Sequence, residues 1–570
     1  MQWKQFRHID ARSGSLRAKA ALLVLLLPFS SIAQEKSQSG LELKAARAMV
    51  DQPVRAPHAM IASANALATE AGLKVLREGG NAVDAAVAVA VALAVVHPEA
   101  GNLGGSGHML IRMHDGQVAA IDYSGMSPAA TNSETSWKDL QYGYRSAAVP
   151  GTPAGIGMAH DKFGQLSWRR CLQPAYELAS KGFPASERME LILSLQVPVM
   201  KQFPESSKVF MHGADKPLKQ GEWVKQQDLA KTIARMQAKG WQEFYTGKTA
   251  ELIAADMAAH GGWITTEDLR NYRAEIHEPI RFTYRGNQVL TVPPSASGGL
   301  TEAVALNTLE NESLPVGSEG SSQARHLQVE ALRRGFEAAR LYERTDEKAP
   351  LSAFLSKSYA AKLSASILPD KASEITVSDP DTHESTETTH FSVIDSDGNM
   401  VSNTYTLSGY YGSQVMAAGT GVLLNNHMSV FNHDPHTKYF LAPHQRYIST
   451  LAPTILLHQD GTPWAAFGTP GAATIPSTVV QMMNNLVDFK MSLRDAIEYP
   501  RIHYDLRHNV IEAEPGALVV DVADRLEAMG YKLNPKLRSQ GDVNAVEVEE
   551  GTGWRVGSSD GRRGGAAEGY

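Results

Sequence analysis

One helix in the sequence is apolar on almost every face, and this limits the folds open to the chain. The segment from Ala82 to Val96 reads AVDAAVAVAVALAVV, with Asn81 before it as an N-cap and Pro98 behind it as a stop. A helix that is apolar all round has to be covered on all sides. With about 15 residues and Asp84 inside, it is a poor membrane span. The sequence therefore predicts a deeply buried helix.

The composition is that of a soluble globular protein, with 43% hydrophobic and 20% charged residues in a chain of 570. This length allows either one large α/β unit or several ordinary domains. The formal charge of −7 is spread along the chain without a basic block. Nucleic acid is therefore not an expected partner.

The first residues predict a secretory signal peptide, 1–33. Positive charges precede the short apolar run AALLVLLLPF, and the small residues SSIA follow it, so cleavage is expected after Ala33. The run is too short to span a bilayer comfortably, which makes an uncleaved anchor the weaker interpretation. The mature protein is thus expected in the periplasm or outside the cell, free of the membrane. Its single cysteine, Cys171, cannot form an internal disulfide.

A glycine-rich loop, GNLGGSGHMLIRM, follows the apolar helix and enters a strand. It contains neither G-x-G-x-x-G nor a G-K-[ST] ending, so dinucleotide and P-loop interpretations fail. Close packing of the backbone explains these glycines better. No cofactor is predicted.

Strands dominate after the acidic segment DKASEITVSDPDTHESTE, which is predicted to be an exposed loop. The stretches THFSVID and MVSNTYTL alternate in polarity on either side of the turn signal SDGN, which predicts a hairpin. Pairing across this turn brings Thr406 opposite Thr388, to within about one residue. The simplest interpretation is a surface hairpin, because threonine is a good strand residue.

A second interpretation gives the strand start a chemical role. If the chain is cut before Thr388, its hydroxyl becomes a nucleophile, and its new α-amine, with a pKa of about 8, can act as the base. Such a cut needs an exposed stretch upstream, and the acidic segment is one. The small-residue turn GTPGAAT, Gly468 to Thr474, can offer backbone N–H groups to an oxyanion.

Several long motifs, in order, resemble the γ-glutamyltranspeptidase (glutathione hydrolase) family of N-terminal-nucleophile hydrolases. They are AGNLGGSGHMLIR, VPGTPAG, GGWITTEDLRNY, PPSASGG, TTHFSVID with DGN, GVLLNN, APTI, GTPGAA and GSSDGRRGGAAEGY. The likeness covers nearly all of the mature chain. It implies an α/β fold, a four-layer αββα sandwich, from a precursor that cleaves itself between Glu387 and Thr388. A large subunit, 34–387, and a small subunit, 388–570, would then form a heterodimer.

The resemblance also implies catalytic roles for four residues. Thr388 would be the nucleophile of both self-cleavage and turnover, and Thr406 would hydrogen-bond to it and support it. The backbone N–H groups of Gly471 and Ala472 would form the oxyanion hole. Alanine at the second position keeps its N–H, so this role survives unless the backbone there requires a positive φ.

Further positions match substrate-binding residues of the family. Ser449 and Thr450 match paired serines that hold the carboxylate end of the substrate. Ser408 stands where many members have Asn or another polar residue. His427 lies near the expected pocket, where it either lines the wall or serves packing and hydrogen bonding.

Two positions depart from the glutathione-cleaving members. Ser124 stands where an Arg binds the glutamate α-carboxylate, and Val430 where an Asp binds the α-amino group. A charged hydrogen bond is worth about 1.5–3 kcal/mol, so losing two would weaken γ-glutamyl binding by roughly 10² to 10⁴. The segment from Phe431 to Arg446 is also shorter than the lid loop of many members. These departures resemble the branch with cephalosporin (glutaryl) acylase-like members, unless Arg446 or a nearby acidic residue replaces the missing groups.

The expected function is cleavage of γ-glutamyl amides such as glutathione, with water or an amino acid or peptide as acceptor. The alternative is an acylase for glutaryl or other acyl amides. A secreted binding protein without turnover is a third possibility, but it would not need Thr388, Thr406 and the glycine turn.

Two other chemistries are disfavoured. His383 and His390 flank the acidic run, but their spacing matches no metal-ligand signature, and HESTE is not H-E-x-x-H. No G-x-S-x-G elbow is present, which argues against a serine α/β-hydrolase. No metal is predicted.

Overall fold

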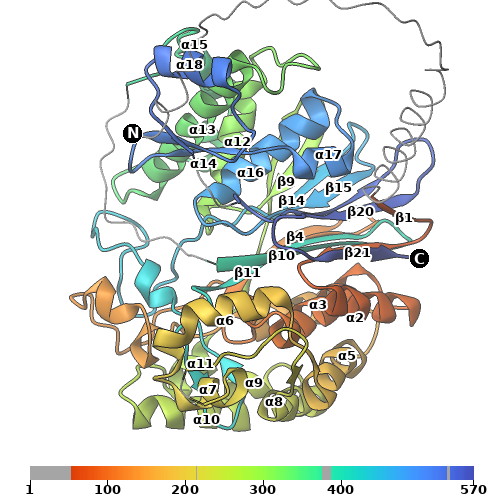
Figure 1. Cartoon of the computed structure of the whole chain (residues 1–570), viewed down its shortest axis with the longest axis vertical. Helices are drawn as coiled ribbons and strands as arrows, with labels where there is room; N and C mark the ends of the chain where they lie inside the picture. The colour runs from red at the N-terminus through yellow and green to blue at the C-terminus, as the bar shows by residue number, and fades with distance from the viewer. Residues whose placement is uncertain (1–52, 214, 375–386, 536–538) are drawn as a thin grey trace, which may run out of the picture. The chain divides into compact units, whose positions relative to one another are not determined.

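Two antiparallel sheets of seven strands lie face to face in the unit Pro53–Tyr570 (Figure 1). The computed structural model describes residues 53–213, 215–374, 387–535 and 539–570. The predicted signal peptide, His383 and most of the acidic segment before Thr388 lie outside the described residues.

The first sheet contains the predicted hairpin. Its strands, from edge to edge, are β21 (Ala566–Gly569), β2 (Met60–Ser63), β10 (Glu387–Ile394), β11 (Met400–Ser408), β3 (Ser106–Arg112), β4 (Val118–Asp122) and β7 (Glu275–His277). The strands of the second sheet are β1 (Val54–Ala56), β20 (Arg555–Ser559), β19 (Asn544–Val548), β15 (Pro463–Phe467), β14 (Thr454–Leu457), β9 (Asn287–Thr291) and β8 (Ile280–Tyr284). Because side chains alternate along a strand, each sheet turns one apolar face to the other. Leu110 and Ile394 of the first sheet thus share a buried cluster with Leu290, Ile455 and Val546 of the second.

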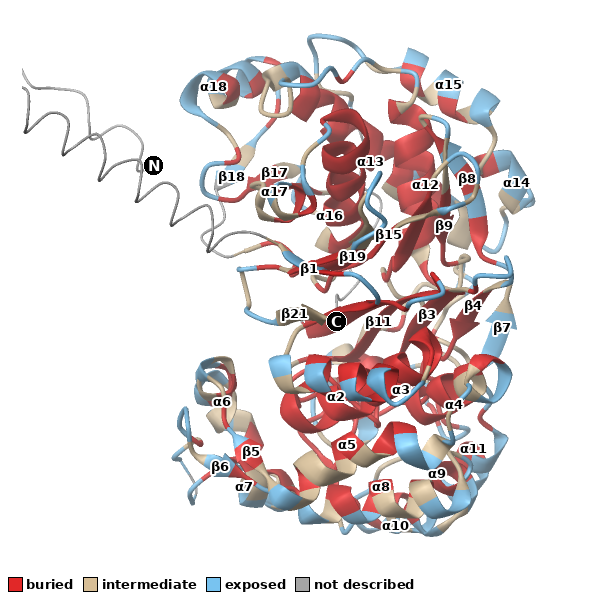
Figure 2. Cartoon of the chain, turned by 90° about the vertical axis from the view of Figure 1, so that its right-hand side faces the viewer, coloured by how far each residue is buried: buried red, intermediate tan, exposed pale blue. Residues whose placement is uncertain are grey.

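Helices cover the outer face of each sheet (Figure 2). The first sheet carries α2 (Ala66–Arg77), α3 (Ala82–Val96), α4 (Thr152–Phe163) and α5 (Trp168–Lys181), and beyond them α6 (Glu187–Met200), α7 (Pro204–Phe210), α8 (Gln227–Lys239), α9 (Glu243–Thr246), α10 (Lys248–Ala259) and α11 (Thr266–Asn271). The second sheet carries α12 (Ser297–Leu309), α13 (Ser322–Glu343), α16 (Thr474–Met483) and α17 (Leu493–Glu498), with α14 (Leu351–Phe354), α15 (Lys357–Ala365) and α18 (Val520–Ala528) outside them. The predicted four-layer αββα sandwich is therefore confirmed.

The apolar helix predicted from the sequence is α3, and every one of its residues is buried. Its start is fixed by a capping box, in which the Asn81 side chain accepts the N–H of Asp84 and the Asp84 side chain accepts the N–H of Asn81. The helix packs between the first sheet and the outer helices, and this explains why it needs no polar face. No helix in the described ranges is both long and apolar enough to cross a membrane.

The glycine loop before β3 brings backbones into close contact, as predicted. A Cβ on Gly105 would lie 2.2 Å from the carbonyl oxygen of Thr406, and one on Gly107 would lie 2.4 Å from Cβ of Tyr405. Only glycine allows β3 to approach β11 this closely. The loop therefore supports the strand end that carries Thr406.

Candidate active site

Thr388 lies near the start of β10, where the ladder between β10 and β11 is irregular. Glu387 pairs with Ser408 and Thr389 pairs with Tyr405, which places Thr388 at a bulge. This register confirms that the SDGN turn brings the two threonine-bearing strand ends together. Thr388 is 1% exposed, and its hydroxyl has no hydrogen-bond partner in the described part of the structure. Leaving such a group unpaired costs about 1–3 kcal/mol, which is typical of a functional position rather than a structural one.

The Thr406 side chain contacts the peptide group that precedes Thr388. Its hydroxyl donates to the Glu387 carbonyl oxygen at 2.5 Å and accepts the N–H of Ser408 at 2.7 Å. The resemblance implied a bond to the Thr388 hydroxyl, whereas in the continuous chain the Thr406 hydroxyl is committed to this carbonyl. Ser408 has a φ of 79°, in the left-handed region that is uncommon for residues other than glycine. Thr406 thus polarises the carbonyl of the bond expected to be cut.

A pocket of about 220 Å³ opens beside Thr388. It brings together most of the predicted site residues, namely Thr388, Thr406, Ser408, His427, Val430, Ser449, Thr450 and Ala472. The Ser449 hydroxyl is buried and has no partner within the described ranges. The Thr450 hydroxyl instead donates to the Ala472 carbonyl at 2.9 Å. The Ser449 hydroxyl is therefore free to form a new hydrogen bond at the pocket, while Thr450 braces the neighbouring turn.

The turn after β15 carries the two residues expected to form the oxyanion hole, and both have a positive φ. Gly471 has a φ of 138° and Ala472 a φ of 55°. Neither N–H has an intramolecular acceptor among the described residues. The alanine at the second position does adopt a positive φ. Ala472 occupies the left-handed region, where an L-residue is strained by about 1–2 kcal/mol. The turn keeps both N–H groups but stores strain at the pocket wall.

Replacing Ala472 by Gly is expected to stabilise the protein by about 0.5–1 kcal/mol. Glycine removes the left-handed strain, and its extra entropy in the unfolded chain costs less than this strain. The midpoint of urea unfolding measures this. The control is Ala361→Gly, at an exposed position inside α15, where glycine only adds entropy to the unfolded chain. That variant is expected to lose stability, and a gain of equal size in both would contradict the explanation.

Ser124 does not line the pocket but lies one layer behind His427. It is buried, and a Cβ on the adjacent Gly125 would come within 2.9 Å of Nδ1 of His427. Ser124 is held by its own backbone, since its N–H donates to Asp122 at 2.7 Å and its carbonyl accepts from Tyr272 at 2.8 Å. From this position, a side chain would have to be longer than serine to extend past His427 into the pocket.

Arg446, the candidate replacement for the missing arginine, does not line the pocket either. Its guanidinium donates to the carbonyl oxygens of Ser124 and Arg273 and pairs with Glu275 at 3.2 Å. These backbone and side-chain contacts hold it on the side of β4 and β7. The structure therefore does not support a role for Arg446 in substrate binding.

His427 forms part of the pocket wall. Its ring stacks on that of Tyr447, with centroids 4.4 Å apart. Burial lowers the pKa of His427 to about 3, so the imidazole is neutral at physiological pH. It can shape the pocket and exchange hydrogen bonds there, but it cannot supply a positive charge.

Charged side chains that sequence reasoning missed also line the pocket. The end of α13 contributes Phe336, Ala339, Arg340 and Glu343, which share one face of the helix. Arg507 comes from the segment after β16 (Ile502–Asp505). Enclosure of the carboxyl group raises the pKa of Glu343 to about 7. The helical spacing in FEAARLYE shows that these residues share a face. Nothing in the sequence shows that this face meets Thr388.

The histidines and acidic clusters of the described residues have structural partners. His390 is buried between the hydroxyls of Thr404 and Ser392, at 2.8 and 2.9 Å. Burial lowers its pKa to about 3, as expected for a neutral ring in the sheet interior. The metal-like group of Asp84, His160 and Cys171 is accounted for by α3 capping and by the N–H groups that Asp84 accepts.

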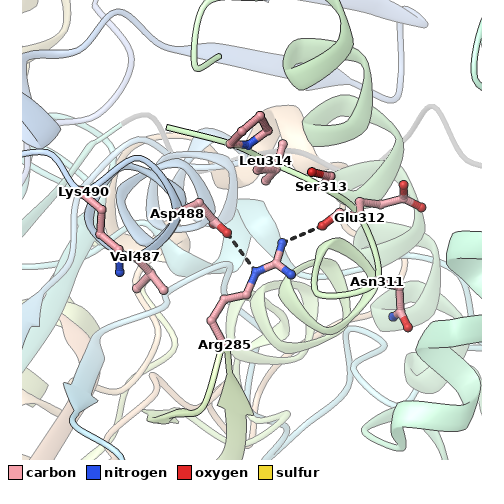
Figure 3. Close-up of a pocket in the computed structure, with 9 residues that line it drawn as sticks. Arg285, Asn311, Glu312, Ser313, Leu314, Val487, Asp488 and Lys490 are labelled. Atoms are coloured by element: carbon pink, nitrogen blue, oxygen red, sulfur yellow. Dashed lines mark hydrogen bonds and ion pairs between the residues drawn. The ribbon is translucent and has the colours of Figure 1, made fainter. Parts of the chain in front are cut away.

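A second hollow of about 570 Å³ lies beside Arg285 and holds none of the predicted site residues (Figure 3). The Arg285 guanidinium donates to Asp488 at 2.9 Å and to the Glu312 carbonyl at 2.8 Å. It also donates to the carbonyls of Leu309 and Glu310. The arginine therefore clamps the end of α12 to the segment after α16.

Known proteins resemble this chain over most of its length. The chain matches the gamma-glutamyltranspeptidase family over residues 68–570. It is 37% identical over 523 residues to the glutathione hydrolase proenzyme of Escherichia coli (strain K12), covering 88% of this chain and 90% of that protein. It is 33% identical over 512 residues to the acylase ACY 1 proenzyme of Pseudomonas sp. (strain V22), with 87% and 90% covered.

Solved structures give the same result. The cephalosporin acylase from Bacillus halodurans matches with a TM-score of 0.83 at 28% identity, covering 91% of this chain and 97% of that one. The γ-glutamyltranspeptidase of Helicobacter pylori matches with a TM-score of 0.52 at 35% identity, covering 54% of this chain and 91% of that one. The family match and the curated relatives each extend over most of the chain. The chain therefore belongs to the γ-glutamyltranspeptidase family.

Proposed function

We propose that the protein cleaves itself before Thr388 and then hydrolyses or transfers γ-glutamyl groups from small amides through an ester on Thr388. The observation that carries this proposal is the buried, unpartnered Thr388 hydroxyl, which faces a pocket next to a carbonyl already polarised by Thr406. Relatives named glutathione hydrolase proenzyme support both the activity and the self-cleavage.

Self-cleavage would begin with attack of the Thr388 oxygen on the carbonyl carbon of Glu387. The C–O ester bond forms as the C–N bond breaks, and the hydroxyl proton ends on the Thr388 nitrogen. Thr406 donates to the oxygen on which negative charge develops. Water then hydrolyses the ester, which gives the proposed large subunit, 34–387, a carboxylate. The Thr388 hydroxyl is restored in the small subunit, 388–570, whose α-amine became free when the C–N bond broke.

Turnover would reuse the same oxygen. The α-amine of Thr388 accepts the hydroxyl proton while the oxygen attacks the substrate amide, and the same proton passes to the leaving amine. The N–H groups of Gly471 and Ala472 would stabilise the oxyanion. Water or an acceptor amine then attacks the ester and regenerates Thr388. Each step needs only this chain and its substrates.

The pocket wall favours an acyl group that carries charge. Arg340 and Arg507 can meet an α-carboxylate and Glu343 can meet an α-ammonium, which supports a γ-glutamyl group despite Ser124 and Val430. The second candidate is a glutaryl amide, which lacks the ammonium. It is favoured by Val430, which replaces the acidic group at the pocket, and by the acylase relatives.

The ratio of kcat/KM on γ-glutamyl-p-nitroanilide to that on glutaryl-p-nitroanilide decides between these candidates. We expect a ratio above one for the wild type, and we expect Glu343→Gln to lower it by roughly 10-fold, because one charged hydrogen bond is lost. The wild-type ratio should rise as the pH passes about 7, since only then does Glu343 carry its charge. The control is Glu337→Gln on the exposed face of α13, which should leave the ratio unchanged. A wild-type ratio well below one identifies an acylase.

We also propose that the mature protein works in the periplasm or outside the cell. The signal-like segment 1–33 is the support, and the test is N-terminal sequencing of exported protein, which should begin at Gln34. A protein that stays in the cytoplasm with Met1 in place would overturn this.

A further inference from the structure

A buried ion-pair network surrounds Glu387, the residue before the proposed nucleophile. Its carboxylate pairs with Arg563 at 2.5 Å and with Arg188 at 3.2 Å, and the Tyr410 hydroxyl also hydrogen-bonds to it. These partners come from the C-terminal segment after β20, from α6 and from the turn after β11. Glu387 is 1% exposed, and the side chains of Arg188 and Arg563 are 18% and 15% exposed.

Each arginine of this network pairs with a carboxylate while Glu387 is present. Arg188 also pairs with Glu99 at 3.3 Å, and Glu99 is ionised because His97 and Arg188 overcome its burial and lower its pKa to about 2. Two guanidinium groups thus face two carboxylates. Burial and the neighbouring Asp560 raise the pKa of the nearby Asp542 while Glu387 is in place. Once Glu387 leaves, Arg563 loses the one carboxylate with which it forms an ion pair in the described part of the structure, at a position where water is scarce.

The Glu387 carboxylate lies next to the backbone nitrogen of Thr388. An oxygen of the Glu387 carboxylate is 3.2 Å from the Thr388 nitrogen, the atom that becomes the catalytic base after the cut. The pocket proposed for the acyl group lies elsewhere, since its wall includes neither Arg188 nor Arg563. A leaving or attacking amine has to reach the same nitrogen to exchange its proton. A carboxylate attached to that amine would therefore fall where the Glu387 carboxylate lies in the precursor.

We infer that Arg188 and Arg563 form a carboxylate-binding subsite for the amine component of the reaction, filled by Glu387 before self-cleavage and vacated by it afterwards. The subsite would take the C-terminal carboxylate of an amino acid or peptide acceptor or leaving group. This inference rests on the proposed function and names the acceptor class of that site. In the precursor, the Glu387 side chain would act as an internal mimic of that carboxylate and keep acceptors out.

The test compares two acceptors that differ only in charge, with γ-glutamyl-p-nitroanilide as donor to the cleaved enzyme. The wild type should have a KM for glycylglycine roughly 10- to 100-fold below that for glycylglycinamide, since a charge-assisted hydrogen bond of this kind has that effect. Arg563→Gln should raise the KM for glycylglycine by a similar factor and leave that for the amide unchanged. Arg563→Lys should recover part of the difference. Arg344→Gln, in a surface pair with Asp346, is the control and should change neither.

The outcomes separate the possible failures. If the wild type does not distinguish the two acceptors, the subsite is absent or still filled by Glu387, and the inference is overturned whether or not any Arg563 variant is cleaved. If Arg563→Gln raises the KM for glutaryl-p-nitroanilide but not that for glycylglycine, the arginine binds the carboxylate of the acyl group. The assignment of the subsite to the amine component is then wrong. If the wild type releases p-nitroaniline from neither γ-glutamyl nor glutaryl donor, the proposed function itself fails.

Discussion

Protein carrying Thr388→Ala is expected to remain a single chain, whereas the wild type separates into two bands on a denaturing gel. The alanine variant should run just below the 61.7 kDa of the full sequence, by the mass of the signal peptide. The loss should be complete, because alanine lacks the hydroxyl proposed to attack the Glu387 carbonyl at this bulge. It should also abolish turnover of γ-glutamyl-p-nitroanilide.

Thr388→Ser provides the matched control, since it keeps the hydroxyl and removes only a methyl group. It should still be cut, so loss of cleavage in both variants would indicate misfolding rather than loss of the nucleophile. Continued cutting of Thr388→Ala at the same bond, shown by N-terminal sequencing of the smaller band, would disprove the role of Thr388. A wild type that is never cut and never turns over an amide would favour a binding protein.

Thr406→Val should slow self-cleavage by roughly 10² to 10³-fold, the usual effect of removing one oxyanion donor. Valine has nearly the shape of threonine but cannot donate to the Glu387 carbonyl oxygen, where negative charge develops during attack. The rate is measured by following precursor loss over time on a denaturing gel.

Thr406→Ser keeps the donor and should be cut at close to the wild-type rate. The free energies of unfolding of the two variants should differ by only about 1–2 kcal/mol, because valine loses two buried hydrogen bonds while serine loses one methyl group. Equal cleavage rates for valine and serine would show that the 2.5 Å contact with the carbonyl does not assist the cut.

The parts of the site that follow from local patterns could be predicted. Alternation and the SDGN turn fix the register of β10 and β11, so the meeting of Thr388 and Thr406 follows from a single stretch of sequence. The burial of α3 follows equally from its own composition.

Contacts between distant segments could not be predicted. Arg188 and Arg563 reach Glu387 across 199 and 176 residues, and no periodicity in the sequence links them. The same holds for Glu343, which meets the pocket only because α13 packs over the second sheet. Backbone geometry was also inaccessible, since the positive φ of Ala472 depends on how the turn after β15 enters α16.

The strand order of the two sheets determines when the proposed cut can take place during biosynthesis. In the first sheet, β2 from the large part lies between β21 and β10 from the small part, and in the second sheet β9 pairs with β14 and β1 with β20. Neither product could complete a sheet alone, and each would expose unpaired strand edges. Folding therefore has to precede scission, and the two polypeptides made separately should aggregate rather than find each other. Once formed, the proposed two-chain molecule would be held together by backbone ladders and would come apart only by unfolding.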